Sequence, residues 1–247
     1  MMSPDSLRVA VLVPAWNEAR SVGITIREIN AASAEYDVIV IDDGSTDGTA
    51  DVAAAAGAVV LRLPFNLGVG GAMRTGFTYA ARNGYERAIQ VDADGQHDPA
   101  DIARVLAGLE HADISIGARF ADVGDYTVRG PRRWAMAVLA SVVSRIAKTR
   151  LTDVTSGFRA ADQRAIEQYV SYYPAEYLGD TLDSLVAAVH AGLTVTQVPV
   201  AMRARSHGTP SQHPIGAAIY LLRSAFALLL AVMRNPRRRT RDEGSVE

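Results

Sequence analysis

An α/β fold with a mostly parallel sheet, flanked by helices on both faces, is the architecture that the first 117 residues predict. Two continuous apolar, β-branched runs, RVAVLV at 8–13 and DVIVI at 37–41, are typical of strands buried on both faces of a parallel sheet. Segments with helical periodicity alternate with such strands, and the connections are short. This alternation favours helices that cover both faces of one sheet.

The expected elements follow one another in a regular order. Strands are expected at 8–13, 37–41, 58–63, 87–91 and 113–117. Helices are expected after Glu18, over 51–56, from the glycine-rich turn through Tyr79, and from Pro99 onward. In the first helix Val22, Ile26 and Ile29 share one face, and in the last one Asp98 is the expected N-cap before Pro99.

The second half of the chain is less regular. An arginine-rich loop covers 119–133, and a helix with a broad apolar face is expected at 134–146. A turn at 151–159, an aromatic and acidic stretch at 169–183, an edge strand at 194–200 and a polar loop at 203–213 complete this half. A boundary near residue 212 would separate a domain of residues 1–212 from an apolar helix and basic tail over 213–247.

Composition and charge exclude several classes of protein. The 247-residue chain is 49% hydrophobic and has a net charge of −2, so no global field favours nucleic acid. It has no cysteine, which excludes disulfides, thiolate metal sites and a cysteine nucleophile. The N-terminus lacks a basic region followed by an apolar one, so we expect no signal peptide and a chain that faces the cytosol.

An apolar stretch near the C-terminus points to a membrane or to a partner. Ile215–Met233 is long enough to consider as a membrane span, but Arg223 lies near its middle, where a charge is costly. We therefore favour an interfacial or partner-packing helix, with the basic cluster Arg237–Arg241 on anionic lipid. An ordinary core-packing helix with a basic tail is the alternative.

A pair of carboxylates at the end of a buried strand is the strongest candidate for a site. The apolar run at 87–91 ends abruptly in Asp92 and Asp94, and Gln96 follows. Two like charges at one backbone corner are unfavourable unless a cation binds between them. Carboxylate and amide oxygens suit Mg²⁺ or Mn²⁺, so Asp92, Asp94 and Gln96 are candidate metal ligands. A solvated turn with a helix cap is the alternative.

Two further turns follow neighbouring strands, and the carboxyl ends of such strands share the edge of the sheet where ligands bind. The acids Asp42 and Asp43 could accept hydrogen bonds from a base or a ribose, or only cap a turn. An EF-hand is incomplete there, because Ala54 occupies the position of the bidentate glutamate. The glycine-rich turn Asn66–Gly71 has Met73 where a dinucleotide-binding fingerprint needs glycine, so its glycines instead permit a close approach of the chain.

Four arginines precede the apolar helix at 134–146, namely Arg119, Arg129, Arg132 and Arg133. Guanidinium groups beside apolar surface suit a ligand that carries a phosphate and is partly apolar. A solvated basic rim is the alternative.

In their order and spacing, these motifs resemble the family-2 glycosyltransferases with a GT-A fold. The resemblance is carried by Val13-Pro-Ala-Trp-Asn-Glu18, Asp42-Asp-Gly-Ser-Thr-Asp-Gly-Thr49, Asn66-Leu-Gly-Val-Gly70, Asp92-Ala-Asp-Gly-Gln-His97, Gly117-Ala-Arg119 and Thr155-Ser-Gly-Phe-Arg159. Within the family, the chain is most similar to dolichyl-phosphate or polyprenyl-phosphate sugar transferases.

The resemblance implies a role for most of these segments. The nucleotide would be held by Pro14, Ala15, Trp16, Glu18, one or both of Asp42 and Asp43, and Asn66. Asp92 and Ala93 would line the nucleotide-sugar, whereas Asp94 and Gln96 would hold Mg²⁺ or Mn²⁺ on the diphosphate. Arg119 and an arginine at 132 or 133 would face the acceptor, and Arg205 would belong to a loop that closes over the donor.

The implied reaction is an inverting, metal-dependent transfer of a sugar from a nucleotide-sugar to a polyprenyl phosphate at the cytoplasmic face of the cell membrane. Its partners would be the donor, the lipid acceptor, and a membrane surface or small membrane protein that the chain contacts peripherally. The sequence is compatible with an oligomer. The candidate catalytic residues are Asp92, Arg119, Arg132, Arg133 and Asp180.

Two other functions remain open. In a transfer to a sugar hydroxyl of a polysaccharide or glycolipid, Asp180 would act as the base. A phosphate acceptor is already anionic near neutral pH and needs no base, and Tyr177-Leu-Gly-Asp180 departs from the family's usual Glu-Asp pairing, which favours the phosphate. The third hypothesis is a non-catalytic protein on this fold that binds a nucleotide-sugar or serves as a membrane scaffold.

Overall fold

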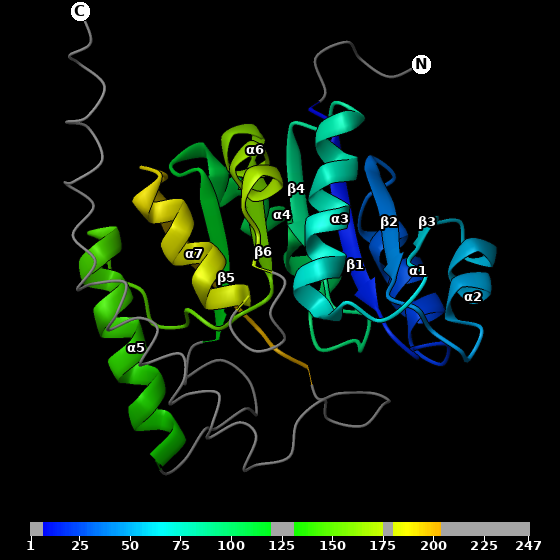
Figure 1. Ribbon diagram of the computed structural model, residues 1–247, viewed down its shortest axis with the longest axis horizontal. Helices are drawn as coiled ribbons and strands as arrows, with labels where there is room; N and C mark the ends of the chain where they lie inside the picture. The colour runs from blue at the N-terminus through cyan, green and yellow to red at the C-terminus, as the bar shows by residue number, and fades with distance from the viewer. Residues whose placement is uncertain (1–6, 120–130, 175–179, 204–247) are drawn as a thin grey trace, which may run out of the picture. The chain divides into compact units, whose positions relative to one another are not determined.

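The computed structural model describes residues 7–119, 131–174 and 180–203 (Figure 1). The chain divides into two units, residues 1–210 and 211–247, and the second unit lies outside the described residues. The predicted boundary near residue 212 and the predicted helix at Ile215–Met233 therefore stay predictions. Within the described ranges, no helix is long and apolar enough to cross a membrane.

The described part of the chain contains one sheet of seven strands, in the order β3-β2-β1-β4-β6-β5-β7. The strands are β1 (Val9–Ala15), β2 (Tyr36–Asp42), β3 (Val59–Arg62), β4 (Arg87–Gln90), β5 (Ile114–Arg119), β6 (Arg159–Asp162) and β7 (Val195–Val200). Only β6 pairs antiparallel with its neighbours among these strands, and the other pairs are parallel. The prediction of a mostly parallel sheet is confirmed, with the edge strand at 195–200.

The strand β6 was not predicted. The sequence predicts only a turn up to Arg159, but a strand begins at that residue and runs to Asp162 between β4 and β5. Its four residues, RAAD, contain no β-branched side chain and are too few to show an alternating pattern. The strand exists because two flanking strands offer it hydrogen bonds, which a local pattern does not reveal.

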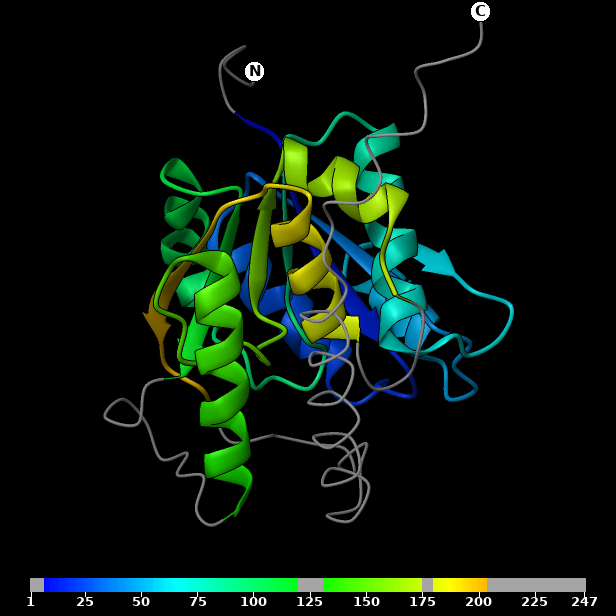
Figure 2. The same cartoon turned by 60° about the vertical axis from the view of Figure 1, so that its left-hand side comes forward.

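Helices cover both faces of the sheet (Figures 1 and 2). Helices α3, α6 and α7 lie on one face, and α1, α2 and α4 lie on the other. The helical segments are α1 (Val22–Ala32), α2 (Thr49–Ala55), α3 (Gly68–Arg82), η1 (Pro99–Asp101), α4 (Ile102–Ala107), η2 (Gly108–Glu110), α5 (Pro131–Ala147), α6 (Gln163–Ser171) and α7 (Asp180–His190). The helices α6 and α7 were not predicted, and 169–183 was expected only as an aromatic and acidic stretch.

The central strands are apolar throughout because both of their faces are covered. Val11 and Val13 of β1 belong to the core cluster with Ile26 of α1. Leu12, between them, faces α3, where a Cβ added to Gly76 would lie 3.2 Å from its Cδ1 atom. Glycine at this position therefore lets α3 approach the sheet closely.

Asp113 lies at the amino end of β5 and contacts Thr194, just before β7, and Arg164 of α6. Replacement of Asp113 therefore tests how much these contacts stabilise the fold. Its Oδ2 accepts hydrogen bonds from Thr194 N and Oγ1, both at 2.7 Å, and its Oδ1 lies 2.6 Å from Arg164 Nη1. Burial raises the pKa of this carboxyl, but the bonds from Thr194 and the charge of Arg164 outweigh burial, and the pKa is lowered from its ordinary value of 3.8. The charged form is thus favoured in the folded state.

We expect Asp113→Asn to lower the free energy of unfolding by about 2 kcal/mol at neutral pH. Because folding lowers this pKa, the advantage of the natural chain is present above 3.8 and shrinks as the pH falls below that value. Urea unfolding at neutral and at acid pH measures both effects. Asp51→Asn is the control, since its ion pair with Arg62 is exposed. Equal destabilisation by the two substitutions would contradict this prediction.

Candidate active site

Three polar turns lie side by side at the carboxyl edge of the sheet. They are Pro14–Glu18 at the end of β1, Asp42–Gly48 at the end of β2, and Asp92–Asp98 just beyond β4. In the sheet β1 lies between β2 and β4, so the chain first moves outward to β3 and then returns to the other side of β1. Open α/β sheets bind their ligands in a crevice at such a reversal of strand order.

The first two turns are joined by hydrogen bonds between them. Asn17, whose φ of 55° is left-handed, donates its N–H to Ser45 Oγ at 2.9 Å. Its Oδ1 accepts from Thr46 N at 2.9 Å, and Glu18 N donates to Thr49 Oγ1 at 2.9 Å. The turns therefore form one surface, which no local pattern predicts, because the bonds join residues 28, 29 and 31 positions apart.

The predicted nucleotide residues of the first turn differ in exposure. Ala15 is buried, Pro14 is partly buried, and the Trp16 side chain is half-exposed, at 50%. The Glu18 carboxylate accepts a hydrogen bond from Ser21 Oγ at 2.5 Å. Trp16 thus offers an exposed, flat apolar side chain beside polar residues of the same turn, and such a side chain suits a stacked base or sugar.

The two acids after β2 have different partners. Asp43 accepts hydrogen bonds from Leu67 N at 2.7 Å and from Gly68 N at 2.8 Å, through one oxygen each. Burial raises its pKa, the two backbone bonds lower it, the charge of Asp42 raises it further, and the net shift is upward. Asp43 therefore fixes the glycine-rich turn at the start of α3, and Asn66 Oδ1 accepts from Gly68 N as well. Asp42 Oδ1 accepts from Ser45 N within its own turn.

The Asp92 carboxylate has a different neighbour beside each of its two oxygens. Gln90 Nε2 donates to Oδ1 at 3.0 Å, and Nε2 of His97 lies 3.6 Å from Oδ2. His97 also accepts the Asp92 N–H with Nδ1 at 3.0 Å, so the ring carries its proton on Nε2, facing the carboxylate. His97 is 2% exposed and stacks on Phe158 at 4.8 Å. The sequence analysis did not assign it a role, because a lone histidine is not a signal by itself.

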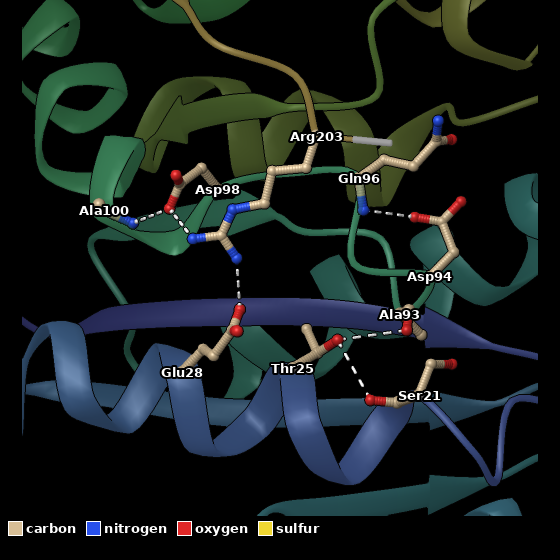
Figure 3. A network of polar contacts seen from close by, with 9 residues as sticks. All are labelled: Ser21, Thr25, Glu28, Ala93, Asp94, Gln96, Asp98, Ala100 and Arg203. Carbon is tan, nitrogen blue, oxygen red and sulfur yellow. Dashed lines mark hydrogen bonds and ion pairs between the residues drawn. The ribbon is translucent and has the colours of Figure 1, made fainter. Parts of the chain in front are cut away.

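Asp94 and Gln96 lie on the same turn, as Figure 3 shows. Asp94 is 7% exposed, and its Oδ1 accepts the Gln96 N–H at 3.0 Å. The carbonyl oxygen of Ala93, just before them, accepts from Thr25 Oγ1 at 3.2 Å. The turn is therefore tied to α1, although neither Thr25 nor α1 carries a chemical motif.

The turn Thr155–Phe158 lies close to the turn Asp92–Asp98, which we call the acidic loop. A Cβ added to Gly157 would lie 2.9 Å from Gln90 Nε2 and 3.5 Å from Asp92 Oδ1, so glycine permits this approach. The buried Arg159 donates to the carbonyls of Ser156 at 2.7 Å and of Thr181 at 2.5 Å. The turn is thereby connected to the first residues of α7.

Comparison with known proteins shows which family the chain belongs to. Residues 10–170 match the family described as Glycosyl transferase family 2, which covers well over half of the chain. The chain belongs to glycosyltransferase family 2.

Two relatives of this glycosyltransferase match along most of their length. The undecaprenyl-phosphate mannosyltransferase of Micrococcus luteus is 32% identical over 214 residues, which cover 82% of this chain and 86% of the relative. The polyprenol monophosphomannose synthase of Mycolicibacterium smegmatis is 29% identical over 210 residues, which cover 81% and 79%. The resemblance described from the sequence is confirmed.

Solved structures confirm the GT-A fold. The glucosyl-3-phosphoglycerate synthase of Mycobacterium tuberculosis, in complex with Mn²⁺, uridine diphosphate and glucosyl-3-phosphoglycerate, has a TM-score of 0.69 at 22% identity. The match covers 92% of this chain and 80% of that chain. A complex of the same synthase with Mg²⁺ and uridine diphosphate gives a TM-score of 0.68 at 22% identity, with 92% and 79% covered.

The residues predicted to face the acceptor are described by their backbone alone, where they are described. Arg119 is the last residue of β5, and Arg132 and Arg133 lie in the first turn of α5. Asp180 is the first residue of α7. The side chains of these four residues, and Arg129 and Arg205 as a whole, lie outside the described residues.

Within the described residues, no group of three or more histidine, aspartate or glutamate side chains has the arrangement of a metal site. Of the predicted metal ligands, Asp94 and Gln96 are two oxygen-bearing side chains on one turn. Such a set fits Mg²⁺ or Mn²⁺, which take few protein ligands and complete their coordination with water and phosphate oxygens. Asp92, whose two oxygens already face Gln90 and His97, fits a direct ligand less well.

Proposed function

We propose that this enzyme transfers a sugar, with inversion, from a nucleotide-sugar to a polyprenyl phosphate, with a divalent metal, at the cytoplasmic face of the membrane. The observation that carries the proposal is the match over 86% of a relative that is named an undecaprenyl-phosphate mannosyltransferase. The convergence of three polar turns at the switch point of the sheet supports it independently.

The donor occupies the crevice between the turns after β1, β2 and β4. Its base or ribose contacts Pro14, Ala15, Trp16, Glu18 and Asp42, while Asp43 and Asn66 act by fixing the glycine-rich turn that borders the crevice. Asp92 and Ala93 line the sugar and its diphosphate. Arg205 closes over the donor in this proposal.

A bound Mg²⁺ or Mn²⁺ would neutralise the charge that develops on the diphosphate leaving group. Asp94 and Gln96 would hold the ion. Asp92 acts differently: its carboxylate, fixed by Gln90 and His97, orients the sugar relative to the acceptor.

The acceptor needs positioning and not deprotonation. A phosphate monoester has a second pKa of about 6, so it carries a nucleophilic oxygen anion at neutral pH. Arg119 and an arginine at 132 or 133 would pair with its charge and aim one oxygen at the anomeric carbon. In this proposal Asp180 is not a catalytic base.

Labelled UDP- and GDP-sugars, incubated with polyprenyl phosphate and Mn²⁺, test the proposal. We expect a lipid-linked sugar phosphate of inverted anomeric configuration, no product with the unphosphorylated polyprenol, and no product in EDTA. Asp180→Asn should change the rate by less than about threefold, because no base is needed. Transfer to a saccharide hydroxyl that Asp180→Asn abolishes, without lipid product, would overturn the proposal in favour of the polysaccharide or glycolipid transferase.

A further inference from the structure

Arg203, just beyond β7, lies between two carboxylates from distant parts of the chain (Figure 3). Its Nη1 is 2.8 Å from Glu28 Oε2 on α1, and its Nη2 is 2.8 Å from Asp98 Oδ1 at the end of the acidic loop. Asp98 also caps the next helical segment, since the same oxygen accepts the Ala100 N–H at 3.0 Å. One guanidinium group therefore joins α1, the acidic loop and the segment after β7.

The backbone around Arg203 makes the same connection. Arg203 N donates to the carbonyl oxygen of Gln96 at 3.0 Å, and Met202 forms an antiparallel bridge with His97. Ala201 N donates to Asp101 Oδ2 at 3.1 Å. Met202 thus pairs with the acidic loop through an isolated β-bridge, and the Arg203 backbone and side chain add further contacts to the same loop.

Helix α1 holds the acidic loop at both ends. Thr25 Oγ1 binds the carbonyl of Ala93 directly, and Glu28, one turn later, reaches Asp98 through Arg203. Asp94 and Gln96 lie between these two attachment points. In Figure 3 the side chains of Asp94 and Gln96 lie on the far side of the loop from the Arg203 guanidinium. Arg203 is thus placed to fix the loop without contacting what the loop binds.

We propose that Arg203 is a positioning residue for the metal and the donor, because its two ion pairs hold Asp94 and Gln96 in the arrangement that binds the ion and the diphosphate. The inference rests on the proposed function of this loop. The ion pairs are partly exposed, with 42% of the Arg203 side chain accessible, so they contribute little to global stability. Their effect is local, because they keep the acidic loop ordered. Lysine cannot replace arginine fully, because a single ammonium does not span two carboxylates as a planar guanidinium does.

The test compares Arg203→Gln and Arg203→Lys with Arg62→Gln. The last variant is the matched control, because it removes an exposed arginine–aspartate ion pair between α2 and β3, away from the acidic loop. Calorimetry measures the binding of UDP and of GDP, each with Mn²⁺. We expect Kd to rise about tenfold in Arg203→Gln, about threefold in Arg203→Lys, and less than twofold in the control. The tenfold figure is typical for the loss of a residue that orients metal ligands without binding the metal.

Steady-state kinetics separates positioning from a purely structural role. If Arg203 positions the loop, Arg203→Gln raises KM for the donor and the Mn²⁺ concentration for half-maximal rate. It leaves KM for the acceptor unchanged, and excess Mn²⁺ restores kcat. A purely structural role would lower kcat and Tm together, and Mn²⁺ would not restore the rate. That second pattern would overturn the inference.

The outcomes distinguish this inference from the proposed function. If the natural chain binds neither nucleotide with Mn²⁺, the proposed function fails. If it binds and Arg203→Gln binds equally well, only the inference fails. Should Arg203→Gln fold poorly, Glu28→Gln answers the same question, since it removes one ion pair from an exposed position of α1. We expect a rise of about threefold in Kd there, and an unchanged Kd would overturn the inference.

Discussion

Asp94→Asn is expected to lower kcat/KM for the donor by about a thousandfold, or ~4 kcal/mol of transition-state stabilisation. Asparagine keeps an oxygen that can accept the Gln96 N–H, now made to Asp94 Oδ1 at 3.0 Å, so the turn should persist. What the substitution removes is the negative charge that a divalent ion requires beside the diphosphate. The loss should therefore appear in metal-dependent steps and not in folding.

Rates measured over a range of Mn²⁺ concentrations test this expectation, together with calorimetry of UDP and GDP with and without Mn²⁺. The part of nucleotide affinity that depends on Mn²⁺ should vanish in Asp94→Asn, while Tm changes little. Asp51→Asn, an equal change of charge on the exposed face of α2, is the control and should keep full activity. Equal rates for the two variants, or an undiminished rate of the natural chain in EDTA, would contradict the assignment of Asp94.

His97→Leu is expected to lower kcat/KM by about a hundredfold, or ~2.7 kcal/mol. Leucine fills much of the buried volume but leaves the Asp92 N–H without the acceptor that it now has at 3.0 Å. It also removes the Nε2–H that faces the Asp92 carboxylate at 3.6 Å. Asp92 would then be held by Gln90 alone, and a carboxylate that orients the sugar would lose its alignment.

Two companion variants identify the cause of such a loss. His97→Asn offers an acceptor near the position of Nδ1, so we expect its kcat/KM to be about tenfold higher than that of His97→Leu. Phe158→Leu removes the stacked ring beside His97 but keeps both contacts to Asp92, so it controls for packing. Single-turnover rates and donor affinity should be measured for all three. If Phe158→Leu is as slow as His97→Leu, packing and not the orientation of Asp92 explains the effect.

The acidic loop illustrates how far sequence reasoning reaches. The apolar run before Asp92 predicts a buried strand, and the strand places Asp92 and Asp94 at the carboxyl edge of the sheet, as the structure confirms. Asp98 was expected as an N-cap, and its Oδ1 accepts the Ala100 N–H. These features depend on a few consecutive residues, which is why a local pattern captures them.

The roles of individual carboxylates could not be separated in the same way. The sequence presents Asp42 and Asp43 as equivalent, yet Asp43 binds backbone N–H groups 24 and 25 positions further along the chain. Likewise, nothing near Asp92 in the sequence indicates that Gly157 approaches it. Such contacts depend on which strands become neighbours, and the antiparallel β6, which follows Gly157, was not predicted.

The sequence by itself determined the α/β class, the edge of the sheet at which the polar turns meet, and the membership in glycosyltransferase family 2. The periodicity of apolar residues and the order of the motifs can be recognised in the sequence without coordinates. Only the tertiary structure decided which hydrogen-bond partners each carboxylate has. Arg203 shows the reason. It pairs with Asp98, which lies 105 positions earlier in the chain, and with Glu28, which lies 175 positions earlier. Such pairs exist only once the order of the strands brings these segments together.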